Sequence, residues 1–220
     1  MSQTKDIVDT WEMVVVHRMF RREFRLAPNL IRRVADGDRE RAAVVADHLA
    51  ALTDGLHHHH SAEDEHLWPL LLERVGELDG DLVHRMETQH ETVAALLGRV
   101  GELLPRWRTA ADATTGEELA ILFEKSSVAL EEHLADEEQE VLPLCARHLT
   151  QSEWDGLGER AQEGLPKGAR AFVSLGAILQ DATPDERTRF LGKLPLPARL
   201  LWRVAGQGIY RREVIRVHGS

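Results

Sequence analysis

The 220-residue sequence predicts an all-α protein, an up-down-up-down four-helix bundle followed by a C-terminal helical extension. Apolar residues recur at helical spacing through most of the chain, and no convincing alternation typical of a β-strand is present. Four of the helical segments are long and the connections between them are short. Because short connections make neighbouring helices run antiparallel, we expect residues 1–149 to form the bundle and residues 150–220 the extension.

The four long segments are justified by their apolar stripes. The first stripe extends over residues 13–31, the second over 49–70, the third over 86–104 and the fourth over 119–144. Residues typical of turns separate them, near 36–38, 76–78 and 105–115. Each stripe is long enough for several helical turns, so each predicts one helix of the bundle.

The extension begins at Thr150-Gln-Ser-Glu, a pattern typical of a helix start. Prolines at positions 166, 184, 195 and 197 then divide it into shorter helical stretches. Residues 184–220 carry eight basic and three acidic residues, a net charge of +5 in a chain whose total is −10. We expect residues 187–217 to form an amphipathic helix that covers the acidic bundle, with a protein partner or an anionic membrane surface as alternatives.

Composition excludes several classes of function. The net charge of −10 argues against nucleic acid as a partner, because phosphates require a basic footprint. No apolar run exceeds five residues, against the roughly 20 that a membrane-spanning helix needs, so no integral membrane association is expected. The N-terminus lacks the pattern of a signal peptide, and the single cysteine, Cys145, permits no internal disulfide. These features predict a cytoplasmic protein.

Polar residues interrupt all four apolar stripes at comparable heights. Counted from the turns at either end of each hairpin, the histidines of the first and second helices are level, and so are those of the third and fourth. Burying such groups without partners costs several kcal/mol, so four helices that do so together require an explanation. The residues of this predicted layer are His17, His59, Glu63, His90, His133 and Glu137.

Two of the stripes also repeat one motif. Residues 59–70 and 133–144 share a histidine, a glutamate four residues later, a further acid, and a Pro-Leu pair at the same offset. Residues i and i+4 lie on one face of a helix, so the histidine can bind one metal ion while the glutamate reaches a second. Two pairs of imidazoles and two carboxylates predict a dinuclear metal site.

This pattern resembles the hemerythrin-like (HHE cation-binding) family over roughly residues 10–148. The resemblance implies a non-haem centre of two iron ions joined by an oxide or hydroxide. It implies that His17 and His59 bind one iron and that His90 and His133 bind the other, with Glu63 and Glu137 bridging the two. Imidazole ligands alone also suit Zn, Cu and Ni, and neither Zn nor Mn is excluded, so iron is implied by the resemblance.

The sequence departs from the oxygen-carrying members of that family. They have a further histidine one turn from His90 on the third helix, where this chain has Met86 and Ala94. His84 would point about 120° away from His90. We therefore expect an open position on each iron rather than reversible oxygen carriage.

The same residues allow two other interpretations. A ferritin-like site would use Glu63-x-x-His66 and Glu87-x-x-His90, but the first and fourth helices lack the matching glutamates. A structural bundle with surface histidines would not explain six polar residues at one height. The remaining histidines are expected to be solvated or to support the ligands (His57, His58, His60) or to lie on the surface (His66, His148). Asp64 and Glu138 either orient ligands or are solvated, while Cys145 and Met86 are packing residues.

Three classes of function remain. The favoured one is chemistry with a small oxidant such as O2, NO or peroxide, in oxidative or nitrosative stress, because no separate output domain is visible. A peroxidase-like, catalase-like or NO-reactive enzyme would show turnover, whereas a gas, redox or iron sensor would bind its ligand stoichiometrically. An iron store or trafficking protein would bind and release metal without turnover.

Overall fold

The structure is a computed structural model of the whole chain and describes residues 7–163 and 167–219. Within these ranges the regular secondary structure is helical and contains no strand. The predicted fold class is confirmed. The four long helices of the bundle are α1 (Trp11–Arg32), α2 (Arg39–Ala62), α4 (Glu77–Ala110) and α5 (Ala113–Asp136).

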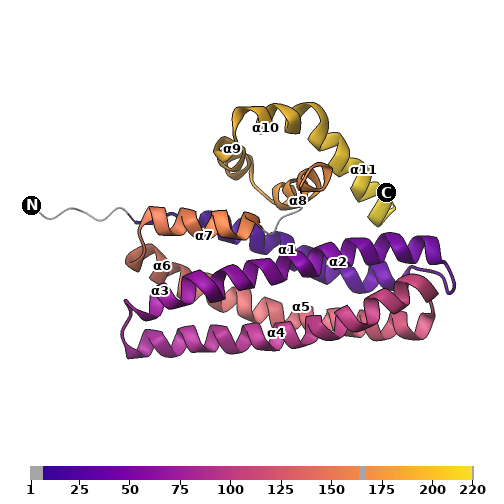
Figure 1. Cartoon of the computed structure of the whole chain (residues 1–220), viewed down its shortest axis with the longest axis horizontal. Coiled ribbons are helices and arrows are strands. Elements are labelled where there is room, and N and C mark those ends of the chain that lie inside the picture. The colour runs from indigo at the N-terminus through magenta and orange to yellow at the C-terminus, as the bar shows by residue number, and fades with distance from the viewer. Residues whose placement is uncertain (1–6, 164–166, 220) are drawn as a thin grey trace, which may run out of the picture.

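These helices form a closed ring in the order of the chain. Helix α1 packs against α2 and α5, and α4 packs against α2 and α5. Figure 1 shows the four lying side by side along the long axis of the molecule. The turns at one end are tight, because the Asp38 and Asp112 side chains cap α2 and α5 by accepting backbone N–H groups. Successive helices alternate in direction. Residues that are distant in sequence therefore lie at the same level along the bundle axis.

The second and fourth members are not continuous α-helices, which the sequence analysis did not predict. Each opens into a π-helical turn, η1 (Glu63–Leu67) and η2 (Glu137–Val141), before the short helices α3 (Trp68–Leu72) and α6 (Leu142–His148). In both, the wide turn begins at the glutamate of the repeated motif and is followed by its proline. Because proline has no N–H to donate, the preceding carbonyls lose their usual partner, and the wide turn accommodates this loss.

Two apolar clusters lie on either side of the predicted polar layer. The larger cluster joins the C-terminal half of α1 to those halves of α2, α4 and α5 that lie near the capped turns. It includes Phe20, Phe24 and Leu56. The other gathers the start of α1 with α3, α6 and α7 (Gln151–Glu163), and includes Met13, Trp68 and Met86. The polar layer is thus enclosed along the bundle axis by side chains that exclude water.

The extension continues from α7 with four further helices. They are α8 (Ala169–Gln180), α9 (Pro184–Lys193), α10 (Leu196–Leu201) and α11 (Gln207–His218), with a π-helical turn at Trp202–Gly206. Figure 1 shows α8 to α11 together on one side of the bundle, above α1 and α2. A small apolar cluster around Trp202 and Leu179 includes Val15 of α1.

Charged pairs complete this contact. Arg18 donates two hydrogen bonds of 2.8 Å to the Glu186 carboxylate, and Lys193 lies 2.7 Å from Glu12. The basic stretch is divided among three helices rather than forming the one amphipathic helix expected over residues 187–217. The prolines at the start of α10 account for its separation from α9, and the π-helical turn Trp202–Gly206 lies between α10 and α11. In the part of the chain that the structure describes, no helix is long and apolar enough to cross a membrane.

Candidate metal centre

The structure brings the six residues of the predicted layer together. The Nε2 atoms of His17 and His59 lie 3.2 Å apart, and those of His90 and His133 lie 3.0 Å apart. Each pair thus joins the two helices of one helical hairpin, as predicted from the number of residues between each histidine and the turn. All six side chains, which also include Glu63 and Glu137, are buried.

The two carboxylates connect the histidine pairs. Oε1 of Glu63 lies 3.3 Å from His59 Nε2, while its Oε2 lies 3.5 Å from His90 Nε2. Oε2 of Glu137 lies 3.4 Å from His17 Nε2 and 3.8 Å from His133 Nε2. Each carboxylate therefore faces one histidine of either pair, which is the arrangement that a group bridging two metal ions requires.

None of the four carboxylate oxygens has a hydrogen-bond partner, although both side chains are fully buried. Buried polar groups are nearly always paired, because an unpaired one costs the full desolvation penalty. The donor atoms His17, His59, Glu63 and Glu137 all lie within 4.8 Å of one another, and so do those of His60, Glu63, His90 and His133. The residues present therefore fit metal cations, which would supply the missing partners.

The pKa shifts agree with this interpretation. Burial raises the pKa of Glu63 well above its usual value, and the charges of Glu137 and Asp64 add to the effect. Burial likewise raises the pKa of Glu137. Burial lowers the pKa of His133 to about 2, helped by its neighbours His90, His17 and Arg21, and burial also lowers that of His59 well below its usual value. Without a cation the layer favours neutral groups, whereas a metal ion stabilises ionised carboxylates beside neutral imidazoles.

Residues outside the layer orient its imidazoles. Nδ1 of His90 lies 2.6 Å from Asp64 Oδ1, and Nδ1 of His17 lies 2.9 Å from Glu138 Oε1. A proton on each Nδ1 leaves Nε2 free to bind a metal ion. Asp64 and Glu138 occupy equivalent positions in the repeated motif. The sequence left two roles open for them, orienting a ligand or being solvated, and each of them makes the orienting contact.

Gln89 orients the third imidazole and was missed by the sequence analysis. Its Oε1 lies 3.3 Å from Nδ1 of His133, and its Nε2 donates to Asp136. Gln89 belongs to no motif, and its only signal in the sequence is its place beside His90.

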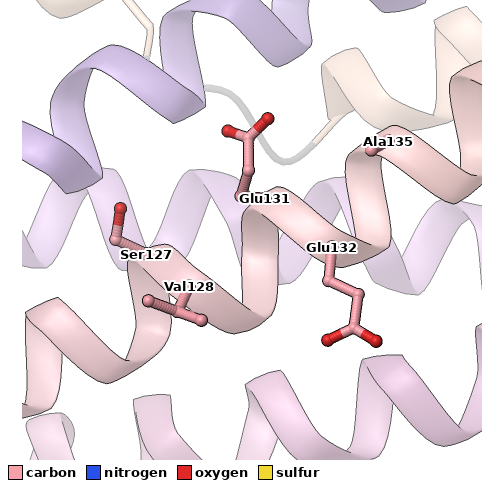
Figure 2. Close-up of a pocket in the computed structure, with 5 residues that line it drawn as sticks. All are labelled: Ser127, Val128, Glu131, Glu132 and Ala135. Atoms are coloured by element: carbon pink, nitrogen blue, oxygen red, sulfur yellow. The ribbon is translucent and has the colours of Figure 1, made fainter.

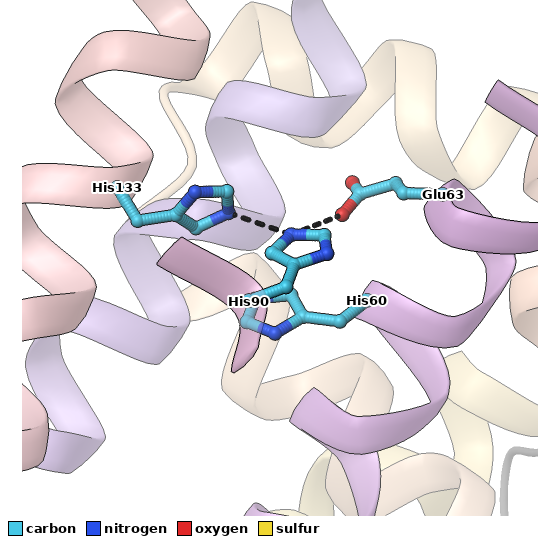
Figure 3. Close-up of side chains that lie close together, drawn as sticks. All are labelled: His60, Glu63, His90 and His133. Atoms are coloured by element: carbon cyan, nitrogen blue, oxygen red, sulfur yellow. Dashed lines mark hydrogen bonds and ion pairs between the residues drawn. The ribbon is translucent and has the colours of Figure 1, made fainter. Parts of the chain in front are cut away.

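His60 is buried against a residue of the layer, so of the two roles expected for it, solvated or supporting the ligands, its position agrees with the second. Its ring stacks on that of His90 with centroids 4.0 Å apart and planes 11° apart, and its Nε2 has no hydrogen-bond partner. Figure 3 shows the two rings overlapping, with His133 and Glu63 on the other side of His90. Because imidazoles bind metals in the plane of the ring, two stacked parallel rings do not suit one ion. The spacing His60-x-x-Glu63 places both residues on one helical face, a signal that could have revealed the burial of His60.

The other candidate residues lie apart from the layer. His57 and His58 are exposed, and His66 is partly exposed beside Glu65. Glu87 pairs with His84 on the surface at 2.7 Å, so the ferritin-like set is not assembled. Cys145 and Met86 are buried in the apolar cluster next to the layer, as packing residues are, and burial raises the pKa of the thiol.

A shallow hollow lies elsewhere, on the outer surface of α5. Figure 2 shows the residues that line it, which are Ser127, Val128, Glu131, Glu132 and Ala135. The hollow includes no residue of the buried layer, and the Glu131 carboxylate is engaged by Arg21 at 3.1 Å. We assign it no part in the metal centre.

Comparison with known proteins agrees with the fold and the layer. The model of the hemerythrin HHE cation binding domain matches residues 8–145. No curated protein and no solved structure matches the chain. The match covers nearly all of the bundle and more than half of the chain, and its description names cations as the ligands. The chain thus belongs to the hemerythrin HHE cation-binding domain family, and it is a metal-binding protein.

Proposed function

We propose that the buried layer holds two iron ions and that these react with a small oxidant such as O2, NO or peroxide. The observation that carries the proposal is the set of four unpaired carboxylate oxygens among four Nε2 atoms in a layer closed to solvent. His17 and His59 would bind one iron, His90 and His133 the other, and Glu63 and Glu137 would bridge them.

Iron would supply electrons and open coordination positions for the oxidant. The chain would supply placement and charge. Asp64 and Glu138 hold the His90 and His17 rings with Nε2 turned inward. Trp68 packs over His90 with ring centroids 5.6 Å apart, and its indole N–H donates to Asp64, so the carboxylate that orients the ligand is itself held in place.

The His60 ring stacks on that of His90 and also lies edge-on to His133, with centroids 5.0 Å apart. Burial, followed by the nearby histidines, lowers its pKa well below the usual value, so the ring is neutral and adds no charge beside the cations. One turn from His90, where oxygen-carrying members of the family have a further histidine, this chain has the fully buried Met86 on one side and Ala94 on the other, and neither side chain has a nitrogen that could bind iron. This supports oxidant chemistry over reversible oxygen carriage.

The test is metal analysis of anaerobically purified protein together with its ultraviolet-visible spectrum before and after exposure to air. We expect about two irons per chain and a new charge-transfer band in air. Glu63→Ala and His133→Ala should lose metal and band together. His84→Ala, which alters an exposed histidine that also pairs with a glutamate, should retain both.

The outcomes separate the classes of function. Turnover of peroxide or NO by the iron-loaded protein supports an enzyme, and stoichiometric binding without turnover supports a sensor. Rapid exchange of the iron with added chelator supports a store. Stoichiometric zinc in place of iron would contradict the redox proposal and leave the fold and the layer unaffected.

A further inference from the structure

A second group of metal-ligating side chains lies at the contact between the bundle and the extension. It consists of Glu23 from α1, His48 from α2 and His218 from the last turn of α11, and their donor atoms lie within 4.8 Å of one another. Glu23 is six residues beyond His17 on α1, about 9 Å along the helix axis. His218 lies outside the segment that the family model matches, so this group is separate from the buried layer.

Its geometry repeats that of the buried layer. Oε2 of Glu23 lies 3.2 Å from His48 Nε2 and 4.0 Å from His218 Nε2. The two imidazole rings are nearly perpendicular, at 73°, with centroids 5.8 Å apart. The corresponding values for His17 and His59 are 77° and 5.2 Å. Two rings that are not parallel can both direct a nitrogen lone pair at one ion, in contrast to the stacked pair of His60 and His90.

The charges around Glu23 leave one of its oxygens for a cation. Arg22 donates to Oε1 of Glu23 at 2.8 and 2.9 Å, and its remaining donors engage Asp181 and the carbonyl of Ala177. Oε2 is left facing the two histidines. Burial would raise the pKa of Glu23, but His48 and Arg22 lower it to about 2, so the carboxylate is ionised at neutral pH. Asp181 offsets the charge of Arg22.

The end of α11 is held in place beside these groups. Arg41 donates to the carbonyls of Arg216 and Val217, which the end of the helix leaves without partners. Val217 is buried in the larger apolar cluster of the bundle, and Gly219 ends the helix in the left-handed conformation, with φ of 85°. The His218 side chain is therefore positioned by its neighbours, while its exposed fraction of 25% leaves a path for an ion from solvent.

We propose that Glu23, His48 and His218 bind one divalent transition-metal ion of the zinc class, which fastens the C-terminal helix to the bundle. Two imidazoles and one carboxylate form a donor set that zinc binds tetrahedrally, with water as the fourth ligand. Ligand bonds of about 2.0–2.2 Å separate the donor atoms of such a tetrahedral ion by roughly 3.3–3.6 Å. The 3.2 Å and 4.0 Å distances at Oε2 require only small movements to reach that geometry.

The experiment uses the full chain with its iron already loaded. Zinc is added in competition with a chromophoric chelator, and iron and zinc are both counted after desalting. Wild-type protein should bind one zinc more than His48→Ala or His218→Gln, with its iron unchanged, and its affinity should exceed theirs at least ~10-fold. His84→Ala is the matched control and should bind zinc as the wild type does, because His84 pairs with Glu87 without a third ligand.

A second readout reports the fastening itself. Hydrogen exchange of the backbone amides in residues 207–218 should slow when zinc is added to the wild type and should not change in His218→Gln. If no extra zinc binds, or if it binds equally to the wild type and both variants, the three residues form only an ion pair between helices and the proposal is wrong. Iron content and oxidant chemistry test the buried layer independently of these results.

Discussion

The buried layer of the bundle and the contact between the extension and α1 treat their carboxylates in opposite ways. In the layer between the two apolar clusters, the carboxylates of Glu63 and Glu137 have no hydrogen-bond partner. Where the extension meets α1, by contrast, carboxylates of the extension are paired with guanidinium groups of α1, as in Asp181 with Arg22 and Glu186 with Arg18. Unpaired groups in the first region indicate a ligand that comes from outside the chain, whereas paired groups in the second hold two parts of the chain together.

The largest expected effect is that of removing metal from the layer. A metal that binds the folded chain alone stabilises it by about 4 kcal/mol at a free concentration 1,000 times its dissociation constant. For a chain of this size that corresponds to a fall of roughly 10 °C in the melting temperature on chelation. Calorimetry of loaded and chelated protein measures the difference, with Glu63→Ala as the variant in which chelation should change nothing. Equal melting temperatures for loaded and chelated wild type would show that the layer is stable without a cation.

The second effect concerns the buried pair at the edge of the extension. Arg22→Ala should lower the free energy of unfolding by about 3 kcal/mol, because it leaves the buried carboxylate of Glu23 without its guanidinium partner. Arg32→Ala is the control, because Arg32 pairs with Glu117 and Glu124 on the surface, where solvent screens the pair, and its loss should cost far less than that of Arg22. Urea unfolding of the two variants compares them directly. Similar losses would mean that burial does not distinguish the two regions.

The sequence predicted the bundle well because its signals are periodic. The heights of His17, His59, His90 and His133 follow from helical rise and turn positions alone, and the structure brings the level pairs within 3.2 Å. The π-helical turns were not predicted, because adding one residue to a single helical turn barely changes the spacing of the apolar residues along the segment. The repeated Pro69 and Pro143, each six residues after a glutamate of the layer, were the signal for them.

Single contacts were harder to predict than periodic ones. Neither Gln89 beside His133 nor His218 beside Glu23 belongs to a pattern, and both contacts depend on how whole helices dock. The docking of α11 on α8 is equally specific, since a Cβ added to Gly176 would lie 2.2 Å from the Tyr210 ring. Such contacts follow from packing that the sequence does not display as spacing.

The smallest expected effect is the response of the extension to acid. The Arg18 guanidinium and the backbone N–H that Glu186 accepts hold the pKa of Glu186 at about 2, below the ordinary 4.5. A carboxyl whose pKa is lowered by folding stabilises the folded chain above pH 4.5 and loses that contribution as the pH falls from 4.5 toward 2. The pair is partly exposed, so we expect less than about 1 kcal/mol.

Hydrogen exchange of α9 amides across this pH window measures the effect. Protection should fall with pH in the wild type, whereas Glu186→Gln should begin with weaker protection and show a smaller fall. Amides of α2 and α5 serve as the internal reference, because these helices are packed into the larger apolar cluster of the bundle. If α9 and the bundle lost protection together at one pH, the extension would unfold only with the bundle, and its charged contacts would not form a separately breakable attachment.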